Sequence, residues 1–316
     1  MRILEFDELP PDTETQAQLL DLSVAWAPVS FSKISEVRKM GYPCADYVGV
    51  YAVEKGEILS AVRVLRLPYT TPEGVRQIAG IQGVVTRRDS RRRGVARELL
   101  REVHRREKAA GCEYSMLWTG RGLVAHSLYE SLGYRDVYTP DLAVLHKSRN
   151  RGAGRYVLES LGEGGTRVME ELHASATAGR LGFTPRPSGM VRSAIHLGFL
   201  PADSLFTIRR GGKDVGYAVL QKHHTWCSLE ELVLDRRTPI EEVLPTLEAS
   251  ISDGWFVIRN TVVRDLTPLL QRRGYHCSPW AYYSLLALPL KRSGEDVVDM
   301  LGTGDRLFTC QGLDYF

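Results

Sequence analysis

Several features that mark other classes of protein are missing from this sequence. No apolar run approaches the roughly 20 residues that a membrane-spanning helix requires. The charges nearly cancel, with 41 Lys and Arg against 38 Asp and Glu, so the chain is not built chiefly to coat nucleic acid. The stretch MRILEFDELPPD lacks the basic and apolar regions of a signal peptide. We therefore expect a cytoplasmic protein without membrane or nucleic-acid partners.

Cysteine is also scarce and is not patterned. The five cysteines, Cys44, Cys112, Cys227, Cys277 and Cys310, are odd in number, widely scattered and never spaced as CxxC. This pattern argues against a disulfide framework and against a zinc site. We expect reduced, mostly buried thiols and no metal cofactor.

What is present is an ordinary globular composition, with 43% apolar and 25% charged residues over 316 positions. This length suggests two domains. In the first half, apolar periodicity and turn signals predict helices over 13–24, 30–40, 95–110 and 124–131, and strands over 47–53, 58–67, 78–86, 114–119 and 137–145. The order predicts an α/β (α+β) fold, with helices packed against a mixed sheet.

The second half repeats the order of the first. GVVTRR at 83–88 is echoed by LVLDRR at 232–237, and LYESLGY at 128–134 by LLQRRGY at 269–275. Chance recurrence of short apolar motifs is the alternative, but similar spacing favours a divergent duplication. We expect a catalytic domain over 1–147, a polar linker over 148–155 and a second domain over 156–316.

The most informative segment is the arginine-rich turn between the strand 78–86 and the helix 95–110. Gly94 and Ala96 keep bulk away from the start of that helix, where unpaired backbone amides and the helix dipole favour an anion. The turn lacks GxxxxGK[ST] and GxGxxG, so nucleoside triphosphates and dinucleotides are disfavoured. A solvated basic face or an RNA contact is the alternative, yet residues 87–102 contain no aromatic side chain for stacking. We interpret the turn as a pyrophosphate site.

This turn resembles the signature of a known family. Arg91-x-x-Gly94-x-Ala96 is similar to the R/Q-x-x-G-x-G/A motif of the GNAT superfamily of N-acetyltransferases, and Ala125 to Tyr134 resembles its A-x-x-x-Y-x-x-x-G-F/Y segment. The tandem layout looks closest to the enhanced intracellular survival (Eis) branch. The resemblance implies two GNAT-like domains, the second degenerate, with acetyl-CoA as cosubstrate.

The resemblance also implies roles for individual residues. The splayed strand would pair with the pantetheine arm through Val84, Val85 and Thr86. The pyrophosphate would be held by Arg91, Arg92, Arg93, Gly94, Val95, Ala96 and Arg97. Tyr129 matches the general acid that protonates the departing thiolate. One departure is Gly122, where the family often has asparagine.

The general base is not evident, because residues 77–86 contain no Asp or Glu. The apolar tail 308–316 should be docked, since disordered tails are usually polar. In the Eis branch a terminal phenylalanine brings its main-chain carboxylate into the active site, and Phe316 resembles it. Asp314 and bulk water are alternatives, and so is a tail that only completes a sheet.

In the second half both signatures are lost. Two carboxylates, Glu241 and Glu242, lie where phosphate would bind, and Leu270 stands in the place of Tyr129. We expect this half to line the acceptor pocket and present the tail. The expected function is transfer of an acetyl group from acetyl-CoA to a primary amine of a small molecule or protein. The alternative is a non-catalytic CoA-binding sensor or assembly module. The oligomeric state, including a homo-oligomer, is left open.

Overall fold

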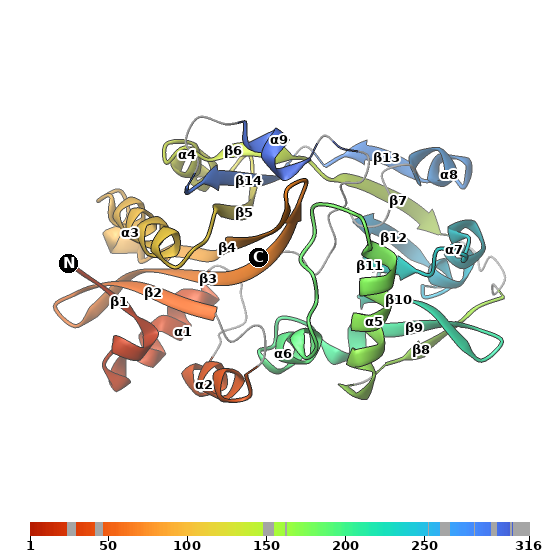
Figure 1. The fold of residues 1–316 in the computed structure, drawn as a ribbon, viewed down its shortest axis with the longest axis horizontal. Helices are drawn as coiled ribbons and strands as arrows, with labels where there is room; N and C mark the ends of the chain where they lie inside the picture. The colour runs from red at the N-terminus through yellow and green to blue at the C-terminus, as the bar shows by residue number, and fades with distance from the viewer. Residues whose placement is uncertain are drawn as a thin grey trace.

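The computed structural model describes residues 1–23, 30–41, 47–147, 155–161, 163–251, 253–259, 266–280, 282–291, 296–303 and 305. Within them, two seven-stranded sheets lie next to each other, each with parallel and antiparallel pairs and flanking helices (Figure 1). The predicted α/β mixed-sheet fold is confirmed. Among these residues no helix combines the length and the apolarity needed to cross a bilayer.

The first sheet has the order β1-β2-β3-β4-β5-β14-β6. Its strands are β1 (Arg2–Glu5), β2 (Tyr47–Glu54), β3 (Glu57–Thr71), β4 (Gly74–Thr86), β5 (Tyr114–Gly120), β14 (Tyr283–Pro289) and β6 (Arg135–Tyr138). One face packs on α3 (Val95–Ala109) and α4 (Val124–Glu130), and the other on α1 (Glu14–Leu22), α2 (Phe31–Lys39) and α9 (Val297–Leu301). On α3 the predicted apolar stripe is real, because Leu99, Leu100 and Val103 are fully buried.

The second sheet has the order β13-β7-β12-β11-β10-β9-β8. Its strands are β13 (His276–Pro279), β7 (Asp141–Lys147), β12 (Gly254–Arg259), β11 (Trp226–Leu234), β10 (Lys213–Lys222), β9 (Leu205–Arg210) and β8 (Val157–Ser160). It packs against α5 (Thr166–Thr177), α6 (Met190–His196), α7 (Ile240–Glu248) and α8 (Thr267–Arg272). The element order thus echoes that of the first half.

The two sheets exchange strands. β7, which follows β6 directly, leaves the first sheet and pairs with β12 and β13. In return β14 enters the first sheet between β5 and β6. Figure 1 shows this as a dark blue strand beside β5 and a yellow-green strand beside the blue ones. The predicted domains 1–147 and 156–316 follow chain order, whereas each sheet takes one strand from the other half.

The exchange explains one difference from the predicted elements. The extended run expected over 137–145 is two strands, β6 and β7, interrupted at Thr139 and Pro140. Pro140 has no N–H to donate to a sheet ladder, so the chain can leave one sheet and enter the other at this point.

Candidate functional site

The central feature of the first sheet is a gap between two parallel strands. β4 and β5 pair from Ile78 and Tyr114 to Gly80 and Met116, and the pairing ends there. Both strands continue, β4 to Thr86 and β5 to Gly120. β4 stays paired with β3 up to Thr86, so the open edge of β4 is the one that faces β5. A shift in register against β3, next to Gly83 at φ +54°, accompanies the separation.

The three strand residues predicted to bind the cofactor arm do not all direct their backbone groups the same way. The N–H of Arg87 donates to the Leu59 carbonyl at 2.8 Å, toward β3. The Thr86 carbonyl instead accepts from the Arg91 Nε at 3.1 Å, away from β3. Backbone groups alternate in direction along a strand, so those of Val85, opposite Ala61, face β3. Thr86 therefore offers its carbonyl to the gap, Val85 does not, and the role of Val84, which lies at the register shift, stays a prediction.

Beyond β4 the chain turns through a 3₁₀ segment at Arg88–Ser90 into α3. The N-cap residue Gly94 has φ +81°, and a Cβ there would meet nothing within 4 Å, so its backbone angle and not crowding requires glycine. No side chain caps the helix, and the N–H of Glu98 makes the first helical bond, to the Gly94 carbonyl at 3.1 Å. The amides of Val95, Ala96 and Arg97 thus have no intrahelical acceptor, which makes this helix start an anion site.

The arginines around this helix start differ in how their charge is compensated. Arg87 pairs with Glu57 and Asp89 at 2.8 and 2.7 Å, and Arg93 pairs with Glu54 at 3.2 Å. The hydrogen bond from Arg93 holds the pKa of the Glu54 carboxyl below its usual value.

Other arginines here keep their charge uncompensated. Arg91, Arg92 and Arg97 are exposed and have no carboxylate partner in the part of the chain that the structure describes. Positive charge therefore remains available at the helix start, as a phosphate ligand requires.

Tyr129 lies on α4, with 6% of its surface exposed, in the same apolar cluster as Val95 and the half-buried Val84. The fold thus places the predicted acid in one apolar cluster with residues of the strand edge and of the helix start. Its ring meets that of Tyr134 edge-on at 5.7 Å. Burial raises the pKa of the Tyr129 phenol well above its usual value, so the group stays protonated at neutral pH.

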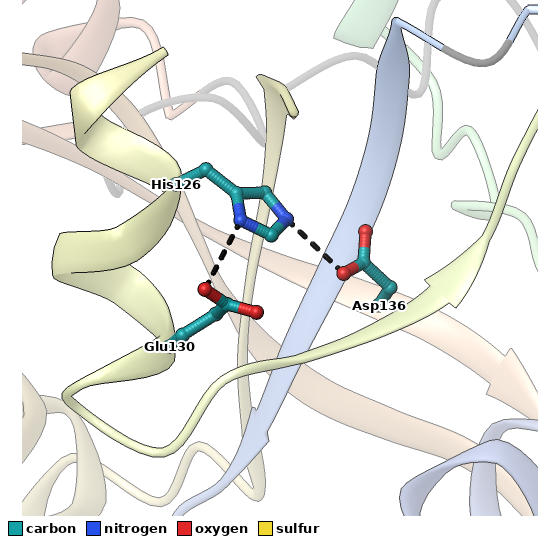
Figure 2. Close-up of side chains that lie close together, drawn as sticks. All are labelled: His126, Glu130 and Asp136. Carbon is teal, nitrogen blue, oxygen red and sulfur yellow. Dashed lines mark hydrogen bonds and ion pairs between the residues drawn. The ribbon is translucent and has the colours of Figure 1, made fainter. Parts of the chain in front are cut away.

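Next to Tyr129 on α4, His126 forms a cluster with two carboxylates (Figure 2). Its Nε2 lies 3.1 Å from Asp136 Oδ2, and its Nδ1 lies 3.4 Å from Glu130 Oε2. Asp136 is also held by Arg121 at 3.2 Å. One imidazole and two carboxylates are a donor set that zinc accepts, with ligand atoms within 4.8 Å of one another. Because each ring nitrogen faces its own carboxylate, the geometry suits a hydrogen-bonded bridge between α4 and β6 better than ligation of one ion. The expectation of no metal stays a prediction.

The candidate bases at the C-terminus are not placed. Phe316 and Asp314 lie outside the residues that the structure describes. The structure adds a carboxylate that the sequence reasoning missed: Asp21, at the end of α1, is buried in an ion pair with Arg63 on β3. Arg63 packs over Gly83, with its Cδ 3.5 Å from where a Cβ would lie. A charged side chain inside the apolar run ILSAVRVLRL was the signal for a buried partner.

Gly122, where the family often has asparagine, also has a neighbour from the other half of the chain. The ring of Tyr282 lies 3.5 Å from the place of a Gly122 Cβ and 2.7 Å from that of a Gly120 Cβ. No spacing within the first half could predict this contact, because strand exchange creates it.

The second sheet has a corresponding strand that runs on past its parallel neighbour. β11 and β12 pair up to Leu229 and Ile258, and β11 continues to Leu234. The helix that follows, α7, has Pro239 at its N-cap and Glu241 and Glu242 in its first turn, as a structural helix would.

Comparison with known proteins agrees with this architecture. Residues 12–137 match the family of the acetyltransferase (GNAT) domain. Among curated proteins no sequence matches. Similar solved structures include a GCN5-related N-acetyltransferase from Anabaena variabilis (TM-score 0.67, 16% identity, 92% of this chain and 73% of that one). Eis1 from Mycobacterium abscessus has a TM-score of 0.62 and 14% identity, over 92% of this chain and 74% of that one. A tandem GNAT protein from the clavulanic acid biosynthesis pathway has a TM-score of 0.54 and 12% identity, over 92% and 100%.

These matches, together with the gap and the turn, define the class. Residues 12–137 are a GNAT acetyltransferase domain, and the whole chain has the fold of tandem GNAT proteins. The two sequence signatures fall inside this matched segment, as expected of an acetyltransferase domain of this family.

Proposed function

We propose that this protein transfers an acetyl group from acetyl-CoA directly to a primary amine, in its N-terminal half. The observation that carries the proposal is the convergence of three features: the open edge of β4, the uncapped start of α3 and the buried hydroxyl-bearing ring of Tyr129. The donor set fits the cosubstrate, because amides and unpaired arginines suit a diphosphate and a strand edge suits an amide-bearing arm.

Each group has a defined task in this mechanism. Acetyl-CoA supplies a thioester whose carbonyl carbon the neutral amine attacks, so that an N–C bond forms and the C–S bond breaks. The N–H of Val84 donates to the thioester oxygen as negative charge develops there. Tyr129 gives its phenolic proton to the departing sulfur and is reprotonated from solvent. The free carboxylate of Phe316, directly or through water, accepts the amine proton, with Asp314 as the alternative.

Thiol release is the direct test. Purified protein with acetyl-CoA and a panel of amines should release CoA thiol only when an acceptor is present, and the product should gain 42 mass units, about one acetyl group in place of one hydrogen. Adding one residue after Phe316 should lower turnover and leave acetyl-CoA binding unchanged. Calorimetric binding of acetyl-CoA without turnover of any amine would instead favour a non-catalytic CoA-binding module.

The remaining expectations belong to the same proposal. The acceptor is a small molecule or a protein amine, and the chain works in the cytoplasm without nucleic acid or membrane as partner. The second half binds no CoA. A salt-dependent affinity for RNA homopolymers that acetyl-CoA does not displace would contradict the assignment of the arginine turn.

A further inference from the structure

The gap between β4 and β5 opens on one side toward a set of aromatic rings that strand exchange assembles. Beyond Met116, the last β5 residue paired with β4, comes Trp118. β14 lies on the other side of β5, with Leu285 opposite Trp118 and Tyr283 opposite Gly120. The ring of Trp118 stacks on Tyr283 at 5.5 Å with 9° between the planes.

The rings continue beyond this pair. Tyr283 stacks on Trp280 at 5.0 Å, and Tyr138 meets Trp118 edge-on at 6.3 Å. At the end of β5, Tyr282 lies over Gly120 and Gly122. We call Trp118, Trp280, Tyr282 and Tyr283 the aromatic shelf.

Tyr282 is the accessible part of the shelf. Its side chain is 52% exposed, whereas Trp280 and Tyr283 are half-buried and Trp118 is buried. The main chain is held there, because the N–H of Arg121 donates to the Tyr282 carbonyl at 2.7 Å, and the two glycines leave room beneath the ring. A half-exposed ring beside the part of β5 that has left β4 offers a face on which a planar group can stack.

The charge next to the shelf narrows the kind of molecule that fits. The guanidinium of Arg259 lies over Trp280, 5.5 Å from the ring centre, and it is 3.6 Å from the carboxylate of Glu230. A cation therefore already occupies the ring surface at the far end, which disfavours an acceptor with several ammonium groups. Tyr282, by contrast, offers exposed aromatic surface.

From this arrangement we propose that the acceptor is an arylalkylamine: one primary amine that enters the gap, carried on an aromatic ring that stacks on Tyr282. This inference rests on the proposed acetyl transfer and adds the class of acceptor. It assigns Tyr282, a residue of the second half, to acceptor specificity in the first. A cyclohexyl ring of equal length is apolar but not planar and gains less from the shelf.

The test compares 2-phenylethylamine with 2-cyclohexylethylamine and spermidine, with thiol release as the readout. The full chain should use the phenyl compound with about tenfold higher kcat/KM than either of the others. Replacing Tyr282 by Ala should lower kcat/KM for 2-phenylethylamine about tenfold and that for the cyclohexyl compound less than twofold. Tyr282→Phe should keep the wild-type preference, and Trp255→Ala, which removes an exposed tryptophan elsewhere, should change neither amine.

The outcomes separate this inference from the function beneath it. Equal use of the phenyl and cyclohexyl amines, a preference for spermidine, or an equal loss for both monoamines in Tyr282→Ala overturns the aromatic shelf while acetyl transfer stands. If no amine releases thiol, the proposed function fails, and calorimetry with CoA present still decides the shelf. In that case 2-phenylethylamine should bind wild type about tenfold more tightly than Tyr282→Ala, and equal binding would overturn it.

Discussion

In both sheets the strand that leads into a helix runs on beyond its pairing with a parallel neighbour, but the chemistry that follows differs. β4 pairs with β5 up to Gly80 and continues to Thr86, and β11 pairs with β12 up to Leu229 and continues to Leu234. After β4 comes an uncapped helix with free arginines, whereas after β11 comes a helix with Glu241 and Glu242 in its first turn. Neither helix has a side-chain cap, so the difference lies in the charge at the helix start, which is positive after β4 and negative after β11.

The halves also differ in what is buried beside the central strand. In the second half Glu231 on β11 accepts two hydrogen bonds from Arg186, at 2.5 and 2.7 Å, and one from Tyr217 at 2.6 Å. Burial by itself would raise the pKa of the Glu231 carboxyl, but the Arg186 guanidinium holds that pKa below its usual value. Glu231 on β11 is thus held in a structural ion pair, whereas the ion pair buried in the first half, Asp21 with Arg63, joins α1 to β3.

The largest expected effect concerns that ion pair. Arg186→Met leaves the Glu231 charge buried without its cation, so the free energy of unfolding should fall by about 3–5 kcal/mol. Urea denaturation measures it, with Arg167→Met as a control in an exposed pair that should cost below about 1 kcal/mol. A loss under about 1 kcal/mol in Arg186→Met would mean that the stability of the second half does not depend on this pair.

A negative charge at the helix start of the first half should abolish cofactor binding. Gly94→Asp places a carboxylate among the free amides and strains φ +81°, so the acetyl-CoA Kd should rise at least about 100-fold. Calorimetry measures Kd. Gly198→Asp is the control, since Gly198 has φ +80° in open space elsewhere. Unchanged acetyl-CoA affinity in Gly94→Asp would contradict an anion site at the start of α3.

Tyr129→Phe should separate chemistry from binding. The phenol's proton is lost while the buried ring stays, so kcat should fall about 100-fold or more with the acetyl-CoA Kd within twofold. Single-turnover kinetics and calorimetry measure the two quantities. Tyr275→Phe, in the second-half copy of the motif, is the control for loss of a buried tyrosine hydroxyl and should leave kcat unchanged. Equal kcat in Tyr129→Phe and wild type would exclude this acid.

A fall in pH should lower the free energy of unfolding through a histidine on α3, which has no counterpart on α7. Burial lowers the pKa of His104 on α3 to about 4, and its Nε2 lies 2.8 Å from the Tyr134 hydroxyl. The unfolded chain binds the proton near pH 6.5, so stability is complete above that pH and is lost as pH falls toward 4, by about 2–3 kcal/mol. The midpoints of urea denaturation, measured between pH 7.5 and 4.5, test this loss of stability. His104→Gln should flatten this part of the profile, and an unchanged slope would argue against a neutral His104.

The smallest expected effect is that of a single arginine. Arg91→Gln removes one unpaired charge from the turn, so the KM for acetyl-CoA should rise about three- to tenfold, and less at high salt. Arg237→Gln removes an exposed arginine from the echo motif LVLDRR and should leave KM unchanged. A similar rise in both variants would mean that net charge, and not the turn, controls affinity.

Local features of the site were predictable from sequence. The turn Arg91 to Ala96 and the register of Tyr129 lie within a strand, a helix start and one helical segment, where spacing along the chain translates directly into geometry. The fold class and the tandem order were confirmed for the same reason. The direction of individual strand groups was less accessible, and Val85 faces β3 although it was predicted to bind with Val84 and Thr86.

What only the tertiary structure decided are the contacts between distant segments. The exchange of β7 and β14, the Asp21 and Arg63 pair, and Tyr282 over Gly120 each join residues far apart in sequence. Periodicity reports which side of an element is apolar, but not which partner covers it, because packing and strand pairing are settled by the whole chain at once. The sequence by itself thus indicated the anion-binding turn and the position of Tyr129, and the fold decided which segments of the second half contact the first.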